Sequence, residues 1–326
     1  MRVGAVGCGN VGLWHQRAFQ SHPASTLVAV CDLDEKKAEE RGRLLGVKAY
    51  PSLARMLESE ALDAVDVVTA DTLHFAPCLQ ALQAGKHVLV EKPLTIELAE
   101  AQQLVAEAAG RGLALAVNHN RRFGLAYQTG RRWLEEGRLG RLCYLVLRQA
   151  QGGPYGARKP YHLVWDMGCH MFDLLRHFGG EIVSMKAEMT DVRGTGYYTS
   201  LAVSAKFSTA AVGTLLLSWD SVFTNGLEYL ELCGDRGRCT MHDVNRGACL
   251  YPHQGEEKVF AEADPFHGYR FEDTFTRRVH AFVDDVTAGR PPHPTGEDGL
   301  AALRLMYDCV RSFETDSVVK PQAVRP

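Results

Sequence analysis

The chain has 326 residues, of which 46% are hydrophobic and 23% charged, and its formal net charge is -3 at pH 7. This length suffices for two domains with separate cores, and the charge balance argues against binding to nucleic acid or to an anionic membrane surface. There is no apolar run long enough to span a bilayer and no signal-like segment before the first strand, so we expect a cytoplasmic protein with no membrane partner. The nine cysteines never form a C-x-x-C pair, which favours reduced thiols and argues against a zinc site.

The first predicted element is a short buried strand, Val3–Val6, which leads into Gly7-x-Gly9-x-x-Gly12 and then into a helix over Leu13–Phe19. Gly7 permits a tight turn, Gly9 lets the backbone come close to a pyrophosphate, and Gly12 lets the helix pack against the strand. The free N–H groups at the start of that helix then face an anion. The motif predicts a dinucleotide-binding loop, with a glycine-rich turn of an unrelated α/β protein as the alternative.

The second predicted strand, Leu27–Cys31, ends in Asp32, about 20 residues beyond the last glycine, where a ribose-binding carboxylate is expected. A carboxylate accepts hydrogen bonds from both ribose hydroxyls of NAD but repels the 2′-phosphate of NADP, and Leu33 rather than a basic residue follows it. NAD is therefore the favoured cofactor. Lys36 and Lys37 stand at the start of the next helix, so some use of NADP stays open.

Strands and helices continue to alternate up to residue 118, which indicates a doubly wound parallel sheet covered by helices on both faces. In chain order, the predicted elements are a helix over Glu35–Leu45, a helical stretch over Pro51–Leu57, a strand over Leu62–Thr69, a helix over Phe75–Ala84, a strand over His87–Val90, a helix between Thr95 and Gly110, and a strand over Leu113–Val117.

The second half of the chain has a different order of elements, because successive predicted strands are separated by glycine or charged turns rather than by helices. This pattern predicts an α+β domain built on a large, mostly antiparallel, open sheet, and an apolar sheet face without covering helices favours a homo-oligomer. We expect domains over residues 1–118 and 119–326, with the C-terminal helix a candidate to pack back on the first domain. The predicted elements are helices over Leu125–Glu136, Asp166–Phe178, Phe275–Ala288 and Gly299–Phe313, and strands over Leu142–Gln149, Ile182–Asp191, Tyr197–Phe207, Ala210–Trp219, Leu227–Cys233 and Arg238–His242.

Three further stretches carry side chains suited to chemistry. Glu91 and Lys92 follow a parallel strand at the sheet edge where ligands of open α/β folds bind, although a solvated loop lysine is the common alternative. The stretch Asn118–Phe123 is polar and basic and lies where the chain leaves the first domain, with a solvated linker as its alternative. Asp166 and His170 are four residues apart, so on a helix they share one face, and the carboxylate can orient the imidazole and raise its basicity.

Taken in this order, the motifs resemble the glucose-fructose oxidoreductase and inositol dehydrogenase family, known as Gfo/Idh/MocA, over nearly the whole chain. The resemblance implies an N-terminal Rossmann domain and a C-terminal domain whose sheet serves substrate binding and assembly into a homodimer or homotetramer. The segment Thr69–His74 departs from the family, which often has Pro followed by Asn or Thr there. The residues that carry the resemblance are Gly7-x-Gly9-x-x-Gly12, Cys31-Asp32, the stretch His74–Leu94 with Glu91-Lys92-Pro93, Arg121-Arg122-Phe123 and Asp166-x-Gly168-x-His170-x-x-Asp173.

The resemblance also implies an NAD-dependent oxidoreductase that transfers a hydride between nicotinamide and a secondary alcohol of a sugar, cyclitol or related polyol. Lys92, Asp166 and His170 are then the catalytic group, with His170 as the base. We expect the cofactor to be bound by Gly7, Gly9, Asn10, Val11, Gly12, Asp32, Thr69, Ala70, Asp71, His74, Glu91 and Lys92. We expect the substrate to be bound by Lys92, Asn118, Arg122, Tyr155, Tyr161, Trp165, Asp166 and His170.

Two other classes of function stay open. One is an enzyme that holds NAD tightly and uses transient oxidation of a sugar to assist elimination or glycoside hydrolysis. The other is a dinucleotide-binding regulator without turnover, which is disfavoured because the three expected catalytic residues are present. A metal site formed by His162, Asp166, His170 and His177 is also disfavoured, because the family chemistry needs no metal and a metal-bound imidazole cannot act as the base.

Overall fold

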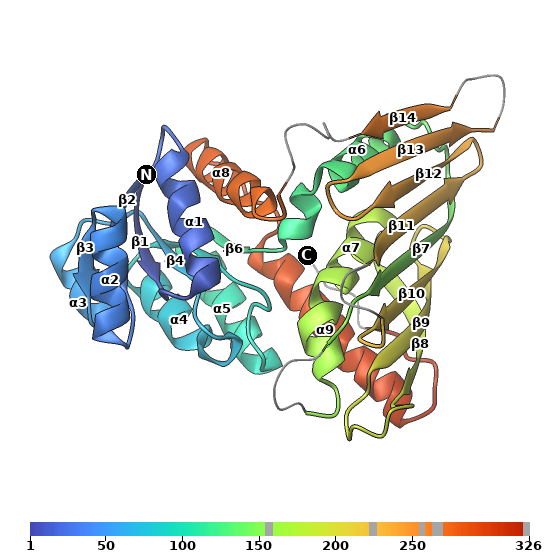
Figure 1. The fold of residues 1–326 in the computed structure, drawn as a ribbon, viewed down its shortest axis with the longest axis horizontal. Helices are drawn as coiled ribbons and strands as arrows, with labels where there is room; N and C mark the ends of the chain where they lie inside the picture. Colours follow the sequence, from blue (N-terminus) through green and yellow to red (C-terminus); the bar gives the residue numbers. More distant parts are fainter. Residues whose placement is uncertain (154–158, 222–226, 254–257, 263–269, 322–326) are drawn as a thin grey trace. The chain divides into compact units, whose positions relative to one another are not determined.

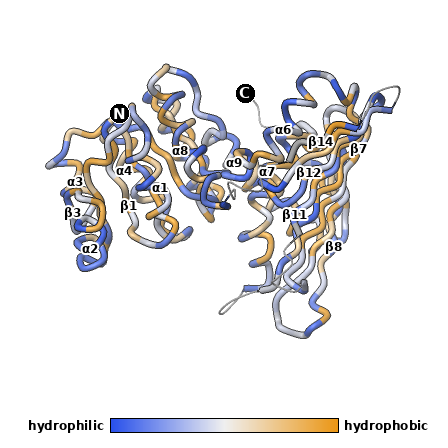
Figure 2. The backbone as a smooth tube through the Cα atoms, turned by 45° about the horizontal axis from the view of Figure 1, so that its top comes forward, coloured by the Kyte–Doolittle hydropathy of each residue, from blue (hydrophilic) through white to orange (hydrophobic). Residues whose placement is uncertain are grey.

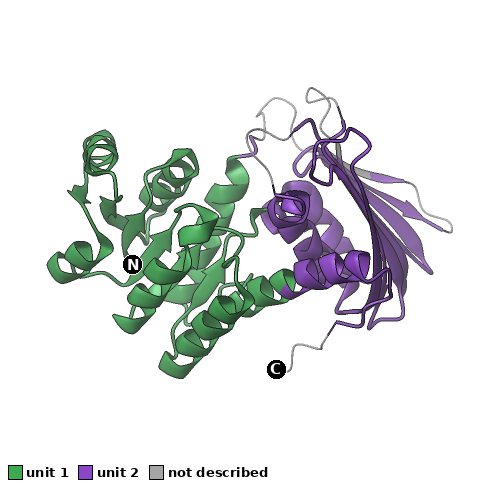
Figure 3. Ribbon diagram, turned by 90° about the horizontal axis from the view of Figure 1, so that it is seen from below, with its two compact units in different colours: residues 1–120, 272–303 green, residues 121–271, 304–326 purple. Residues whose placement is uncertain are grey.

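The computed structural model describes residues 1–153, 159–221, 227–253, 258–262 and 270–321. The chain forms two compact units, one made of residues 1–120 and 272–303 and the other of residues 121–271 and 304–326 (Figure 3). The first unit thus combines the N-terminal part of the chain with a segment that follows more than 150 residues of the second unit.

A six-stranded parallel sheet forms the centre of the first unit, with the strand order β3-β2-β1-β4-β5-β6 (Figure 1). The chain winds outward in both directions from β1 and β4, so the carboxyl edge between them is the topological switch point where ligands of such sheets bind. β4 is buried at every position, as expected for a strand covered on both faces. The strands are β1 (Arg2–Val6), β2 (Thr26–Cys31), β3 (Lys48–Tyr50), β4 (Ala64–Val67), β5 (His87–Val90) and β6 (Leu115–Val117).

Helices cover both faces of this sheet, α1 with α8 on one face and α4 with α5 on the other (Figure 1). The α1–α8 contact is apolar: Phe19 packs edge-on against Phe282 with ring centroids 6.5 Å apart, and both side chains are fully buried. The helices of the first unit, with the short 3-10 helix η1, are α1 (Asn10–Ser21), α2 (Glu35–Leu45), α3 (Leu53–Ser59), η1 (Asp71–Leu73), α4 (Phe75–Gln83), α5 (Leu98–Arg111) and α8 (Asp273–Thr287). The 3-10 helix η2 (Asn120–Phe123) and α9 (Gly296–Glu314) each begin in the first unit and end in the second.

An eight-stranded sheet forms the second unit, with the order β14-β13-β12-β11-β7-β10-β9-β8. Every neighbouring pair is antiparallel except β7 and β10, which are parallel. The two sheets confirm the fold class expected from the sequence. The strands are β7 (Leu142–Ala150), β8 (Ile182–Thr190), β9 (Ser200–Phe207), β10 (Val212–Ser218), β11 (Leu227–Gly234), β12 (Gly237–His242), β13 (Gly247–Pro252) and β14 (Val259–Glu262).

One face of the second sheet is covered by helices, and the other is open. Buried and exposed positions alternate along β9 and β10. Figure 2 shows that the strands of this sheet carry both hydrophobic and hydrophilic residues. α6 (Leu125–Glu135) packs so closely on β12 that a methyl group at Gly130 would lie 2.1 Å from the Met241 sulfur. α7 (Cys169–Gly179) is buried at most of its positions. Among the described residues, no helix is long and apolar enough to cross a membrane.

Candidate active site

The glycine-rich loop connects β1 to α1, and its three glycines have different surroundings. Gly7 has a φ of +104°, and an added Cβ would lie 2.2 Å from the carbonyl oxygen of Val68. An added Cβ at Gly12 would lie 2.6 Å from the carbonyl oxygen of Gly7, whereas one at Gly9 would meet no atom within 4 Å. Gly7 and Gly12 are therefore required by the protein's own packing. Gly9 leaves open space, which is what a pyrophosphate at the start of α1 requires.

Two side chains hold the backbone carbonyls of this loop. The guanidinium group of Arg41, from α2, donates to the carbonyl oxygens of Cys8 at 2.8 Å and Gly9 at 3.1 Å. It also donates to the amide oxygen of buried Gln16 at 2.5 Å, and the Gln16 amide nitrogen donates to the carbonyl oxygen of Gly7 at 3.0 Å. Protein donors thus fix the carbonyl groups of the loop. The first N–H groups of α1 have no acceptor within the helix and are available for a ligand. Nothing in the sequence distinguishes Arg41 from a solvated helix arginine.

Asp32 lies at the end of β2, where the sequence predicts the ribose-binding carboxylate. One of its oxygens accepts the backbone N–H of Cys8 at 2.8 Å and the other accepts that of Asp34 at 2.9 Å. Each carboxylate oxygen keeps lone-pair capacity for one ribose hydroxyl. Leu33 beside it is 85% exposed and offers no positive charge to a 2′-phosphate. These residues therefore fit NAD, which would supply the hydride acceptor when bound.

The remaining predicted cofactor residues of the first unit divide into exposed and buried groups. Asn10, Ala70 and Asp71 are exposed, and Val11 and Thr69 are partly exposed. His74, in contrast, is 1% exposed, and its ring contacts the carbonyl oxygens of Pro93 at 2.7 Å and Thr69 at 3.3 Å. His74 therefore connects the loop after β4 to the loop after β5 through these two ring contacts.

Glu91 and Lys92 follow β5 directly. Glu91 is only 9% exposed, and its Oε2 accepts the backbone N–H of Lys92 at 3.1 Å. Its Oε1 contacts Nε2 of His15 at 3.0 Å and also accepts the side-chain amide of Asn118. Asn118, predicted to bind the substrate, is fully buried, so in this structure its amide serves Glu91.

His15, in α1, is a functional candidate that the sequence analysis did not select. It is fully buried, and its Nδ1 lies 3.0 Å from Oδ1 of Asp66 while its Nε2 faces Glu91. Burial opposes protonation, but the two carboxylates outweigh burial and raise the pKa of His15 to about 10. The two carboxylates therefore favour the imidazolium form of His15. One signal in the sequence could have predicted such a residue. Asp66 stands inside an otherwise apolar strand, and a buried carboxylate needs a positive partner.

In the second unit, Asp166 and His170 lie where the helical segment begins, but the segment differs from the expected α-helix. Val164–Gly168 forms a turn of π-helix, η3, and α7 starts only at Cys169. Hydrogen bonds of a π turn run from residue i to i+5, so the first residues of the expected helix over Asp166–Phe178 are π-helical rather than α-helical. Asp166 is partly exposed, whereas His170 is 6% exposed. Single π turns of this kind occur frequently at functional sites.

Other predicted substrate residues of the second unit make structural contacts. Arg122 binds the buried carboxylate of Asp173 through two hydrogen bonds, of 2.8 Å and 2.5 Å. The hydroxyl of Tyr161 donates to Glu314 at 2.7 Å. Trp165 packs against Tyr307 with ring centroids 4.9 Å apart. Tyr155 lies outside the described residues. The described part of the chain holds no group of three His, Cys, Asp or Glu side chains that could bind a metal ion.

The open glycine loop at the switch point of a doubly wound sheet, together with the carboxylate after β2, places the chain in the class of dinucleotide-binding proteins. Its family follows from comparison with known proteins. Residues 1–119 match the model described as an oxidoreductase family with an NAD-binding Rossmann fold, and residues 127–240 match the Gfo/Idh/MocA C-terminal domain. The chain therefore belongs to the Gfo/Idh/MocA family of NAD-binding oxidoreductases, as its motifs indicated.

Relatives with assigned names match almost end to end. A myo-inositol 2-dehydrogenase of Thermotoga maritima is 27% identical and covers 99% of both chains. A UDP-N-acetylglucosamine 3-dehydrogenase of Acidithiobacillus ferrooxidans is 33% identical and covers 94% of both chains. Among solved structures, a "probable dehydrogenase" from Thermotoga maritima is 26% identical and superposes with a TM-score of 0.86 over 98% of both chains. The protein is thus an enzyme of the dehydrogenase type that acts on alcohol groups.

Proposed function

We propose that this protein is an NAD-dependent dehydrogenase that oxidises a secondary alcohol of a sugar, cyclitol or related polyol. The observation that carries the proposal is the full-length match to relatives named for an inositol and for a nucleotide-linked amino sugar. These two substrates share a ring that carries several hydroxyl groups. The fit of Asp32 and Gly9 to NAD supports the cofactor side of the proposal.

In the proposed reaction, His170 takes the hydroxyl proton of the substrate, and Lys92 stabilises the charge that develops on the oxygen. Asp166 orients the imidazole of His170. Gly9 and Asp32 would hold NAD, which when bound would supply the hydride acceptor.

A turnover screen tests this proposal. The purified protein is incubated with NAD or NADP and a panel of inositols, aldoses, sugar acids and nucleotide sugars, and the absorbance of the reduced nicotinamide is followed. His170→Ala is expected to lower kcat by about a hundredfold to ten-thousandfold while NADH binding persists. The matched control is His177→Ala on the same helix, which is expected to keep turnover.

Two outcomes would contradict the proposal. Near-normal turnover in His170→Ala would remove His170 from the mechanism. Silence across the panel in a protein that binds NADH would instead favour an enzyme that keeps and recycles its cofactor. Mass spectrometry of the cofactor released on denaturation would then detect tightly bound NAD.

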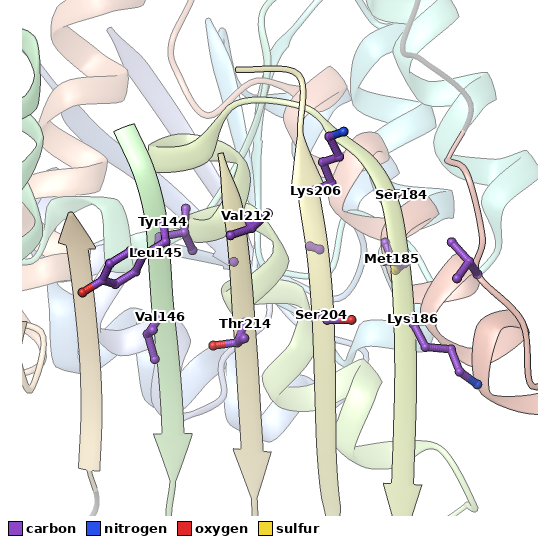
Figure 4. A pocket seen from close by; sticks show the side chains of 13 residues that line it. Tyr144, Leu145, Val146, Ser184, Met185, Lys186, Ser204, Lys206, Val212 and Thr214 are labelled. Atoms are coloured by element: carbon purple, nitrogen blue, oxygen red, sulfur yellow. The ribbon is translucent and has the colours of Figure 1, made fainter. Parts of the chain in front are cut away.

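We also infer that the protein is a homodimer or homotetramer assembled through the open face of the second sheet. That face contains a hollow of about 570 Å³ across β7 to β10, lined by residues such as Tyr144, Ser204 and Thr214 (Figure 4). Val212 and Leu216, on the same face, are 54% and 43% exposed, which is unusual for apolar side chains of a central strand.

Light scattering after gel filtration tests the assembly. Leu216→Glu places a charge in the middle of the open face and is expected to yield monomers, because burial of an unpaired carboxylate is unfavourable. Val192→Glu is the control, since Val192 is 83% exposed outside the strands. A monomeric wild-type protein, or equal assembly in both variants, would refute this interface.

We further infer a cytoplasmic location. All nine cysteines are free thiols in the structure, and seven of them are buried, which agrees with a reducing compartment. Cell fractionation of a tagged protein would test this, and recovery outside the cytoplasmic fraction would contradict it.

A further inference from the structure

Four polar side chains from separate elements meet inside the first unit. His15 comes from α1, Asp66 from β4, and Glu91 and Asn118 directly follow β5 and β6. None of the four is more than 9% exposed, and the ring of Phe275, from α8, lies 5.6 Å from the His15 ring. Because β4, β5 and β6 are neighbours in a parallel sheet, the cluster lies along the carboxyl edge where ligands bind.

The cluster is charged. The two acidic partners favour the imidazolium form of His15. Burial raises the pKa of Asp66, whereas at Glu91 the hydrogen bond from His15 outweighs burial and lowers the pKa. Two further cations act on these carboxylates: Arg278, a buried guanidinium from α8, on Asp66, and Lys92 on Glu91. The interior of the unit therefore contains an ionic array rather than a single ion pair.

Stability is a poor explanation for such an array. Removing charges from water costs so much that apolar replacements of buried ion pairs are frequently neutral or stabilising. In addition, Oδ2 of Asp66 and Oδ1 of Asn118 have no hydrogen-bond partner among the described residues, which adds to the cost. A cluster that is so unfavourable for stability, at the ligand-binding edge of the sheet, is better explained by the backbone that it positions.

The cluster holds the backbone from which Lys92 projects. Glu91 uses one carboxylate oxygen for His15 and Asn118 and the other for the backbone N–H of Lys92. On the other side of Lys92, the carbonyl oxygen of Pro93 contacts His74 at 2.7 Å. Buried side chains thus bind the peptide group that precedes Lys92 and the peptide group that follows Pro93, so the backbone is held on both sides of the lysine.

We propose that His15 is a positioning residue for Lys92: with Asp66 it locks the Glu91 carboxylate in the orientation that holds the Lys92 backbone. The proposal rests on the proposed catalytic role of Lys92. His15 does not touch the substrate; it acts through Glu91.

Two variants and one control test the contacts that run from His15 through Glu91 to the backbone of Lys92. The single variant His15→Gln is avoided, because it leaves two buried carboxylates without the imidazole and is expected to fold poorly. Glu91→Gln keeps the side-chain shape and one acceptor but removes the charge. The double variant His15→Gln/Asp66→Asn removes one charge of each sign. His22→Gln/Asp284→Asn is the matched control, because it removes a histidine–carboxylate contact of 3.2 Å from the far end of α1.

Each variant is measured alone and combined with Lys92→Ala. Alone, Glu91→Gln and His15→Gln/Asp66→Asn are expected to lower kcat about tenfold to a hundredfold with little change in NADH affinity, as for misplaced reacting groups. In the Lys92→Ala background, the same changes are expected to alter kcat by less than about twofold, because residues that act through one another are not additive. Full additivity in that background would overturn the proposal, since a general structural defect adds to the loss of Lys92.

Hydrogen exchange provides a readout that needs no substrate. The peptide that covers the backbone N–H groups of Lys92 and Leu94 is expected to exchange faster in Glu91→Gln and in the His15 double variant, but not in the His22 control. Unchanged exchange would overturn the positioning role even if no substrate were known. If Lys92→Ala itself kept normal turnover while exchange rose in the variants, the proposed function of Lys92 would fail and the contact chain would stand.

Discussion

Gly9→Ala separates cofactor binding from folding in a way that the other loop glycines do not allow. The backbone of Gly9 has φ -72° and ψ -178°, which alanine adopts without strain, and the added methyl group would meet no protein atom within 4 Å. Such a replacement stabilises a protein by about 0.4–1 kcal/mol, because alanine restricts the unfolded chain. We therefore expect the free energy of unfolding in urea to be unchanged or slightly raised.

Cofactor affinity is expected to change in the opposite direction. If the pyrophosphate occupies the open space at Gly9, the methyl group displaces it, and a loss of at least about 1.4 kcal/mol corresponds to a tenfold weaker Kd for NADH. Gly12→Ala is the comparison, because its methyl group would lie 2.6 Å from the Gly7 carbonyl oxygen and such overpacking costs about 1–3 kcal/mol of stability.

Urea denaturation and titration of NADH fluorescence measure the two quantities on the same samples. The expected pattern is weak binding with normal stability in Gly9→Ala, and reduced stability in Gly12→Ala. If Gly9→Ala bound NADH as tightly as the wild-type protein, the open space beside Gly9 would not be the pyrophosphate site, and the reasoning from the glycine surroundings would be refuted.

Two further predictions concern charge. Asp32→Ser removes the carboxylate that repels a 2′-phosphate, so the ratio of NADPH to NADH affinity is expected to rise at least about tenfold in fluorescence titrations; an unchanged ratio would show that another group discriminates. His15 has a raised pKa in the folded protein, so its contribution to stability is complete below its unfolded pKa and is lost as pH rises through about 10. Between pH 7 and pH 10, Glu91→Gln should therefore lose less stability in urea denaturation than the wild-type protein, because His15 has already lost one carboxylate in this variant. Equal losses in the two proteins would contradict the assignment of His15 as a cation.

Much of the fold was readable from the sequence because its signals are local. The apolar strand before Gly7 and the acidic end of the next strand identify the parallel sheet and its ligand edge within 32 residues. β13 and β14 were missed: the Gly-Ala-Cys-Leu run that opens β13 is buried without alternation, and β14 has only four residues. The π turn at Val164–Gly168 has no sequence signal, since its hydrogen bonds depend on packing.

The candidate active site could be predicted from the sequence only in part, because some of its contacts join residues that are far apart in the chain. Lys92, Asp166 and His170 stand in motifs with fixed neighbours, whereas the partners of Glu91 come from elements far apart in the chain. His15 has the spacing of a core residue on an amphipathic helix, and no local pattern shows that its ring meets carboxylates from two strands. Tertiary contacts of this kind become visible only when the sheet order is known.

The first unit is completed by α8 and the start of α9, which follow residues 121–271 of the second unit in the chain, and this order has a consequence for how the protein is made. Residues 296–303 belong to the first unit and residues 304–314 of the same helix to the second (Figure 3). The core of the first unit includes Val279, Phe282 and Val283 of α8, which are synthesised only after residues 121–271 of the second unit. The first unit therefore cannot complete its core before α8 has been synthesised, and a fragment ending at residue 120 is expected to be incompletely folded, with an exposed apolar face.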